Sequence, residues 1–325
     1  MEVTRLARPV EEVLADPAAG ADLKRRLAYA LRAREFATRE LGLPENASYR
    51  RYADLGRPFV VWNVFAAPAL SLELRTQCFP VAGCVVYRGF FAEAAARRHA
   101  DGLRAEGLDV FVGGVPAYST LGWFADPLLN TFIRYPDLEI ARLIFHELAH
   151  QVAYVRDDSA FNESFAVAVE EEGLRRWAQA NAAPAERAEY EAYAARRREL
   201  LRLFARARRE LAAAYAAPVD DAARRAAKAR ILARVADDYA GLRREWNLPA
   251  AQARAYDAWV LQDLNNAKLG SIATYTSRVP QFAALLAQSG GDIRRFHREA
   301  AALAALPREE RNRRLDQLGP QSTED

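Results

Sequence analysis

LIFHELAHQ, residues 143–151, contains the pattern His-Glu-x-x-His at His146, Glu147 and His150. In a helix, residues four apart lie on the same face with their Cβ atoms about 5–6 Å apart, so these two imidazoles can bind one metal ion. Glu147 then lies beside the metal as a general base, which is the arrangement of zinc metalloproteases. The pattern therefore predicts a helix that carries a hydrolytic zinc site.

A chance match is the alternative, because a pattern with three fixed positions also arises by accident in helices. The composition around the motif favours the functional interpretation. The chain has four His, and two of them fall in the motif. An ionised glutamate on a buried helix costs free energy unless it has a partner or a metal. The flanking apolar residues that predict such burial are Ile144, Phe145, Leu148, Ala149, Val152 and Ala153.

A third metal ligand is expected downstream, because catalytic zinc generally takes three protein ligands and keeps one position open. Glu163, in FNESFAVAVEE, follows His150 by thirteen residues. A turn at 156–159 and an antiparallel helix would return it to the metal. The alternative is an ordinary acid at a helix start, favoured by the helix dipole, but the apolar neighbours of Glu163 indicate that it points inward. The other candidates are Glu170, on roughly the same face, and the more distant His99 and His297.

The composition limits the class of protein. The 325 residues suffice for one large domain or two ordinary ones, and the 51% hydrophobic content supports a substantial core. The charge of +3 results from 46 basic and 43 acidic residues, a balance that does not indicate nucleic-acid binding. No run of 18 apolar residues is present, so we expect no transmembrane helix.

The patterns around the motif predict an α+β fold that is predominantly helical. Strand-like runs occur at 59–65, 71–79, 84–87 and 108–112. Helical patterns cover 9–41, 90–103 and most of the chain from Pro136 onward, and we expect a frayed tail after Arg314. The helices 186–216 and 220–246, rich in Ala, Arg and Glu, are expected to be solvated or, alternatively, to form a partner surface.

The expected architecture is a small β-sheet subdomain packed on a zincin-like pair of helices, with a helical C-terminal half. Residues 1–135 would hold the N-terminal helices and the β-rich part. Residues 136–325 would hold the helical metallopeptidase part, with zinc in the cleft between them. A single compact domain is the alternative.

Cys78 and Cys84 are the only cysteines, in QCFPVAGCVVYRG. Pro80 and Gly83 lie between them, so a turn could bring the two sulfurs together. A disulfide would imply an oxidising compartment. Two buried thiols near adjacent strands are the alternative, because sequence alone does not fix the Cα separation.

Several segments between about residues 78 and 268 carry a family resemblance: CFPVAGCVVYRGFF, VPAYSTLGWFADPLL, ARLIFHELAHQ, DSAFNESFAVAVEEEG and LNNAKL. They resemble a bacterial family described as putative zinc aminopeptidases, within the Glu-ligand zincin peptidases. The resemblance implies one Zn²⁺ ion held by His146, His150 and Glu163, with Glu147 as the catalytic base and a peptide as substrate.

The resemblance also implies an exported envelope protein, periplasmic or held by a lipid anchor in a full-length precursor. The printed sequence opens MEVTRLARPVEEVLADP, which has no apolar signal-peptide core. A cytoplasmic location is therefore the alternative.

One departure from the wider class concerns the substrate amine. Well-studied zinc aminopeptidases carry a Gly-x-Met-Glu-Asn strand ahead of HExxH, whose glutamate binds the free amine. Here the equivalent stretch reads GGVPAYSTLG and contains no acid. An endopeptidase is therefore the alternative to an aminopeptidase. The candidates for a substitute acid are Glu73, Glu170 and Asp126.

The reaction also requires a donor for the developing oxyanion. Tyr275, Tyr118 and His297 are the candidates, and the sequence does not select one. A non-catalytic zinc-containing helical binding module is the second alternative to an enzyme. Structural zinc is usually closed by four protein ligands, whereas this motif offers three and leaves Glu147 unused, which favours catalysis.

Overall fold

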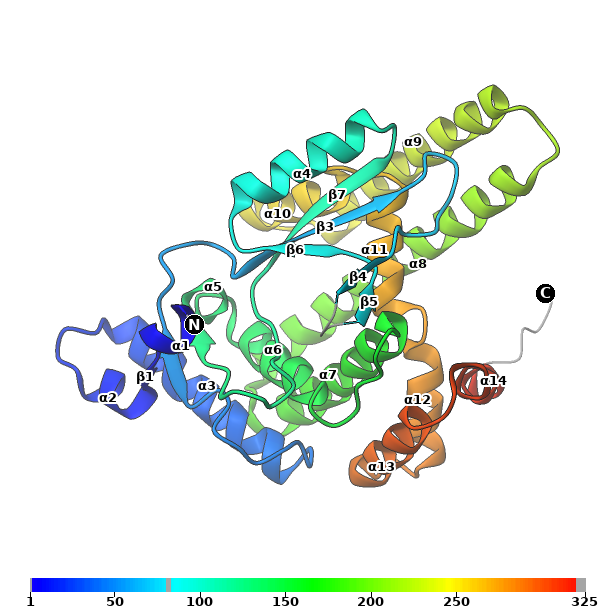
Figure 1. The fold of residues 1–325 in the computed structure, drawn as a ribbon. Helices are drawn as coiled ribbons and strands as arrows, with labels where there is room; N and C mark the ends of the chain where they lie inside the picture. Colours follow the sequence, from blue (N-terminus) through cyan, green and yellow to red (C-terminus); the bar gives the residue numbers. More distant parts are fainter. Residues whose placement is uncertain (1, 80–82, 320–325) are drawn as a thin grey trace. The chain divides into compact units, whose positions relative to one another are not determined.

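The computed structural model describes residues 2–79 and 83–319. Its many helices and three small sheets confirm the predicted α+β, predominantly helical class (Figure 1). The chain forms two compact units, each built from segments distant in sequence. The first comprises Met1–Val61, Gly114–Ala183 and Thr274–Asp325, and the second comprises Trp62–Gly113 and Pro184–Ala273. The division into 1–135 and 136–325 stays a prediction.

Three helices form the centre of the first unit: α3 (Ala21–Arg39), α6 (Asp137–Ala149) and α7 (Ser159–Asn181). Helix α6 packs against both others, and Figure 1 shows α6 and α7 side by side. Gly173 permits this close approach, because a Cβ there would lie 2.8 Å from side-chain atoms of Leu41 and Phe145.

The start of α7 is fixed by side chains. Asp158 accepts a hydrogen bond from the backbone N–H of Phe161, as an N-cap residue does. Arg311, on the last helix, binds Asp158 in turn at 2.7 Å. The predicted frayed tail is wrong for residues 315–318, which continue a helix in which Leu315 is buried. Residues 320–325 lie outside the described residues. The remaining helices of this unit are α1 (Glu2–Leu6), α2 (Val10–Ala15), α5 (Asn130–Ile133), α12 (Val279–Gln288), α13 (Ile293–Ala304) and α14 (Arg308–Leu318).

A sheet of very short strands, which the sequence did not predict, also belongs to the first unit. Its order is β1 (Arg8–Pro9), β2 (Arg51–Ala53) and β8 (Leu128–Leu129). Strand β2 is antiparallel to β1 and parallel to β8. The helix predicted over 9–41 is interrupted at 16–20, where Pro17 and Gly20 disfavour a continuous helix.

The second unit contains the other two sheets. One has the order β6 (Arg88–Phe90), β3 (Val61–Ala67) and β7 (Asp109–Val115). The strand predicted over 71–79 forms only at β4 (Gln77–Phe79), because Leu72 and Leu74 pack against the hydrophobic core instead. The helices of this unit are α4 (Glu93–Ala105), α8 (Pro184–Ala216), α9 (Asp221–Trp246), α10 (Ala250–Leu261) and α11 (Asn266–Thr276).

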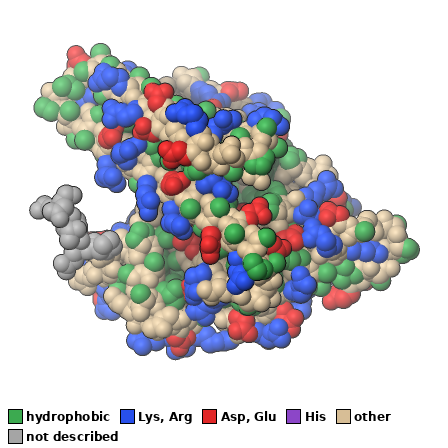
Figure 2. Space-filling view, turned by 180° about the vertical axis from the view of Figure 1, so that it is seen from behind, with side chains coloured by type: hydrophobic (Ala, Val, Ile, Leu, Met, Phe, Trp, Pro, Cys, Tyr) green, Lys and Arg blue, Asp and Glu red, His purple; other side chains and the backbone are tan. Residues whose placement is uncertain are grey.

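The long helices α8 and α9 pack against each other and do not expose their apolar stripes. Leu200, Phe204 and Leu211 of α8 are buried in one cluster with Ile231 and Tyr239 of α9. Most charged residues of these helices are exposed or partly exposed, in agreement with the solvated-helix prediction, whereas Lys228 of α9 pairs with Asp109. On the face shown in Figure 2, acidic and basic side chains are both spread over the surface.

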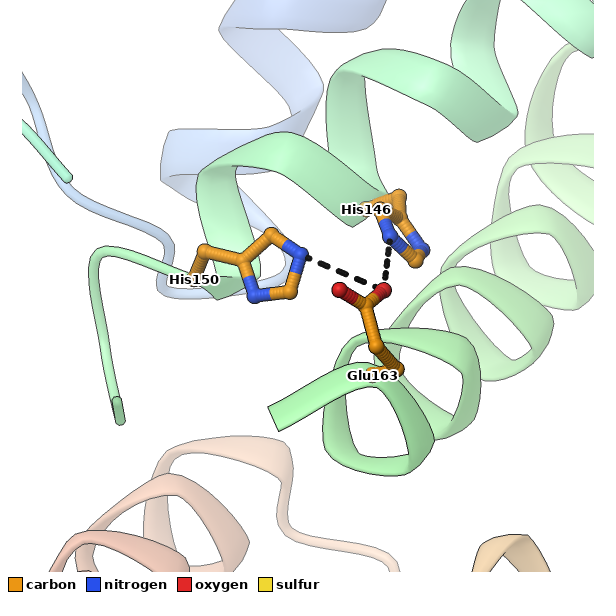
Figure 3. Close-up of side chains that lie close together, drawn as sticks. All are labelled: His146, His150 and Glu163. Atoms are coloured by element: carbon orange, nitrogen blue, oxygen red, sulfur yellow. Dashed lines mark ion pairs between the residues drawn. The ribbon is translucent and has the colours of Figure 1, made fainter. Parts of the chain in front are cut away.

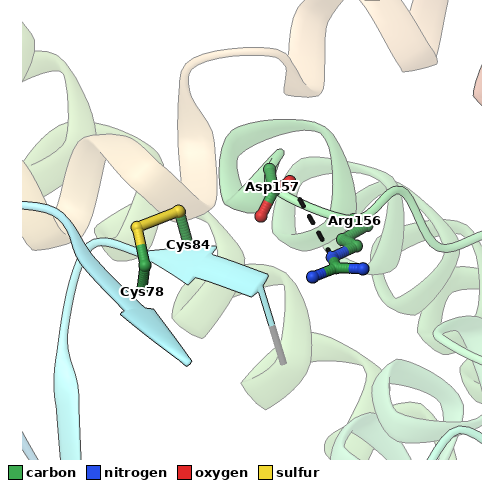
Figure 4. Close-up of a disulfide and its surroundings, with 4 residues drawn as sticks. All are labelled: Cys78, Cys84, Arg156 and Asp157. Atoms are coloured by element: carbon green, nitrogen blue, oxygen red, sulfur yellow. Dashed lines mark ion pairs between the residues drawn. A yellow bond between two sulfur atoms is a disulfide. The ribbon is translucent and has the colours of Figure 1, made fainter. Parts of the chain in front are cut away.

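Strand β4 pairs with β5 (Gly83–Val85), and Cys78 lies directly opposite Cys84. The two cysteines form a disulfide (Figure 4). Of the two alternatives for these residues, the bonded one is therefore present. The predicted turn at Pro80 lies outside the described residues. In the part of the chain that the structure describes, no helix is long and apolar enough to cross a membrane.

Candidate metal centre

Helices α6 and α7 bring His146, His150 and Glu163 together (Figure 3). The Glu163 Oε2 atom lies 3.4 Å from Nε2 of His146 and 3.7 Å from Nε2 of His150. Two ligand atoms that each lie about 2.0–2.1 Å from a tetrahedral zinc ion are roughly 3.3–3.4 Å apart. The three side chains could therefore hold a metal ion with small adjustments. The identity of that metal is not established by this geometry.

The connection between the two helices explains how Glu163 reaches the histidines. Asn162, its neighbour, binds the backbone of Val155 twice. The Asn162 Nδ2 donates to the Val155 carbonyl at 2.8 Å, and the Val155 N–H donates to the Asn162 Oδ1 at 2.7 Å. These bonds fold the connection back on α7 one residue before Glu163. The sequence analysis did not predict this role of Asn162, although the Asn162-Glu163 pair in FNESFA indicates it.

Glu170, another candidate for the third ligand, lies behind His146 and not between the two histidines. It is fully buried on α7, and its Oε2 accepts hydrogen bonds from Nδ1 of His146 and from Arg142, both at 2.9 Å. A donating Nδ1 leaves the lone pair of His146 on Nε2, the atom that faces Glu163. Glu170 therefore orients the His146 ring. His150 has no equivalent, because its Nδ1 has no partner among the described residues.

The other two ligand candidates lie elsewhere. His99 is on α4 in the second unit, where its ring contacts Phe90. His297 is on α13 in an aromatic cluster with Phe165 and Phe296. Neither is part of the group of ligand atoms formed by the described residues. Burial lowers the pKa of His297 to about 4, which is consistent with a neutral core residue.

Burial and neighbouring charges shift the titration of the site. Burial raises the pKa of Glu147 to about 7, and repulsion from Glu163 and Asp126 adds to this shift. Burial alone would lower the pKa of His146, but the hydrogen bonds that its ring donates to the carboxylates of Glu163 and Glu170 raise it to about 10. Burial lowers the pKa of His150 to about 4. Of the two histidines, His146 is therefore the one that more readily carries a positive charge, beside Glu163 and Glu170.

The structure separates the three candidate oxyanion donors. The Tyr275 ring lies against the His146 ring, with centroids 6.4 Å apart and planes 26° apart. Tyr118 is half-buried, and this burial, with a smaller effect of Asp126, raises the pKa of its hydroxyl. His297 lies in the aromatic cluster already described. Tyr275 is therefore the candidate that contacts a residue of the metal-ligand group.

Two histidines one helical turn apart, a carboxylate from the following helix and a glutamate beside the first histidine define a candidate metal centre of the HExxH type. A family model described as "Putative aminopeptidase" matches residues 1–315. The chain belongs to this putative aminopeptidase family, and this membership supports a peptidase-like function and a peptide substrate. No curated protein and no solved structure matches the chain.

Proposed function

We propose that the protein is a zinc-dependent peptidase, and within its family an aminopeptidase. The observation that carries this proposal is the convergence of His146, His150 and Glu163 beside Glu147. Two imidazole nitrogens and one carboxylate oxygen are a donor set that suits zinc. Three ligands leave a fourth position open, which favours the enzyme over the non-catalytic binding module.

The residues of the site have distinct roles in the proposed hydrolysis. When bound, zinc would acidify a water molecule and polarise a carbonyl group. Glu147 accepts the proton of the attacking water and delivers it to the leaving amine. Its burial makes this carboxylate more basic than an exposed glutamate. The Tyr275 hydroxyl donates to the oxygen of the scissile carbonyl as negative charge develops there.

Substitution of Glu147 by Gln tests this proposal. We expect Glu147→Gln to keep bound zinc and to lose at least about 1000-fold in kcat on a peptide library, since the general base is removed. Glu163→Gln should lose both activity and bound zinc, since it removes a proposed ligand. Glu172→Gln is the matched control, because Glu172 lies on the same helix as Glu163 but pairs with Arg175 and Arg176. Equal cleavage by wild type and Glu147→Gln would end the hydrolase proposal.

We also infer that the protein works in an oxidising compartment, as an exported protein. The Cys78–Cys84 disulfide supports this inference, because such bonds persist mainly outside the cytosol. Fractionation of cells that express the native protein, with its cysteine oxidation measured in each fraction, tests it. Recovery of the protein with reduced cysteines in the cytosolic fraction would contradict the inference.

A further inference from the structure

The loop that contains residues 120–126, ahead of α6 in the chain, is held beside the metal-ligand group. The backbone carbonyl of Asp126 accepts a hydrogen bond from the N–H of Tyr49 at 2.6 Å. Asn46 binds the side chain of Gln151, also at 2.6 Å, and Gln151 directly follows His150. The loop and the segment 46–49 are therefore fixed near the C-terminal end of α6.

Asp126 is a buried acid without a cationic partner. Its side chain is 4% exposed, and its Oδ2 accepts a hydrogen bond from the backbone N–H of Thr120 at 2.9 Å. Among the described residues it forms no ion pair with Lys, Arg or His. Burial raises the pKa of the Asp126 carboxyl, because the charged form is unfavourable there without a counter-charge. A buried carboxylate without a counter-charge is costly, so a cation is expected beside it when the site is in use.

Tyr49 supplies a second, independent observation. It is 1% exposed, and its hydroxyl has no hydrogen-bond partner among the described residues. Glu147 and Asp126 both raise its pKa further, after burial. An unpartnered phenol oxygen therefore lies in the field of the same two carboxylates. Buried hydroxyls are nearly always hydrogen-bonded, which indicates that a ligand completes this group.

We propose that Asp126 and Tyr49 bind the free α-ammonium group at the N-terminus of the peptide substrate. This inference rests on the proposed peptidase function and adds the substrate class. An ammonium group has three N–H donors and one positive charge. The ammonium group would donate hydrogen bonds to the Asp126 carboxylate and to the Tyr49 oxygen. Its positive charge would balance the negative charge of Asp126.

The other two candidate acids are less suited to this role. Glu170 is engaged by His146 and Arg142. Glu73 is exposed and lies in the second unit. Asp126 therefore supplies the acid that GGVPAYSTLG lacks, from a position a few residues further along the chain.

A comparison of substrates tests the proposal with the wild-type protein. Alanyl-p-nitroanilide carries the free amine, propionyl-p-nitroanilide lacks it, and N-acetylalanyl-p-nitroanilide blocks it. We expect kcat/KM to be about 100-fold higher for the first than for the other two, since a buried charge pair is lost without the amine. Equal values for the three substrates would overturn the amine site and leave the peptidase proposal intact. Peptidase activity that Glu147→Gln fails to reduce would overturn the proposed function instead.

Two variants test which residues cause the preference for free-amine substrates. Asp126→Asn should lose about 100-fold in kcat/KM on the free-amine substrate and less than about 3-fold on the blocked one, with unchanged zinc content. Tyr49→Phe should lose about 10-fold on the free-amine substrate alone. Tyr52→Phe and Asp54→Asn are the matched controls, because they make the same changes at an interacting tyrosine and aspartate; burial and then Asp54 raise the pKa of Tyr52. Equal losses on both substrates would assign Asp126 to the support of Glu147 and overturn the proposal.

Discussion

Replacement of Glu170 by Gln should weaken zinc binding without removing a ligand. The substitution keeps the shape of a fully buried side chain but removes the charge that accepts from His146 at 2.9 Å. A hydrogen bond to a charged group contributes about 1.5–3 kcal/mol and a neutral one about 0.5–1.5 kcal/mol. The expected loss is therefore about 1–2 kcal/mol, which corresponds to roughly a 5–30-fold weaker affinity. Loss of an acceptor behind a metal-binding histidine typically costs 10–100-fold, in the same range.

Competition with a chromophoric chelator measures this effect as a zinc dissociation constant. The matched control is Glu172→Gln, two residues further along α7, where the side chain pairs with Arg175 and Arg176. Arg142→Met should give a smaller loss in the same direction, because Glu170 keeps its contact with His146. Equal zinc affinity in Glu170→Gln and wild type would refute the inferred role of Glu170.

Three other predictions concern the reaction and stability. Tyr275→Phe should lower kcat by about 100–1000-fold with unchanged zinc content, since one oxyanion donor is removed; an unchanged kcat would exclude that role. His297 is harder to protonate in the folded protein, with a pKa of about 4 against an ordinary 6.5, so wild-type stability should fall as the pH drops through this range. His297→Leu should remove up to about 3 kcal/mol of this acid sensitivity in urea unfolding at pH 7 and pH 4, and identical pH slopes would contradict the assignment. The variant with Cys78→Ser and Cys84→Ser should unfold about 2 kcal/mol more easily, since the disulfide closes a short loop, and a reductant should destabilise only the wild type.

The sequence predicted the helix of the candidate metal centre because the signals for this helix are local. HELAH covers the end of one apolar helix and its C-cap residue His150, and Glu163 follows at a distance that one turn can span. The contact of Glu170 with Nδ1 of His146 was not predictable, since it depends on how α6 and α7 pack against each other. The role of Tyr49 depends on a loop more than seventy residues away in sequence, which no local pattern records.

The errors in the predicted elements have similar physical causes. Strands β1, β2 and β8 have two or three residues each, too few to show an alternating pattern. Residues 71–76 do alternate, but Leu72 packs against the core cluster that includes residues of α8 and α9, and Leu74 packs against Phe65 and Ala67 of β3 and Ala267 of α11. The end of the last helix was predicted to be frayed because its composition is highly charged, and only Leu315 and Arg311 are buried on this helix.

The contact between Arg311 and Asp158 links the C-terminal helix to the candidate metal centre. Asp158 begins the helix that presents Glu163, and the guanidinium that holds it comes from more than one hundred and fifty residues later in the chain. A protein shortened before Arg308 would keep His146, Glu147, His150 and Glu163, yet the first turn of α7 would lose its anchor. Truncation of the last helix should therefore weaken zinc binding before it unfolds the rest of the chain.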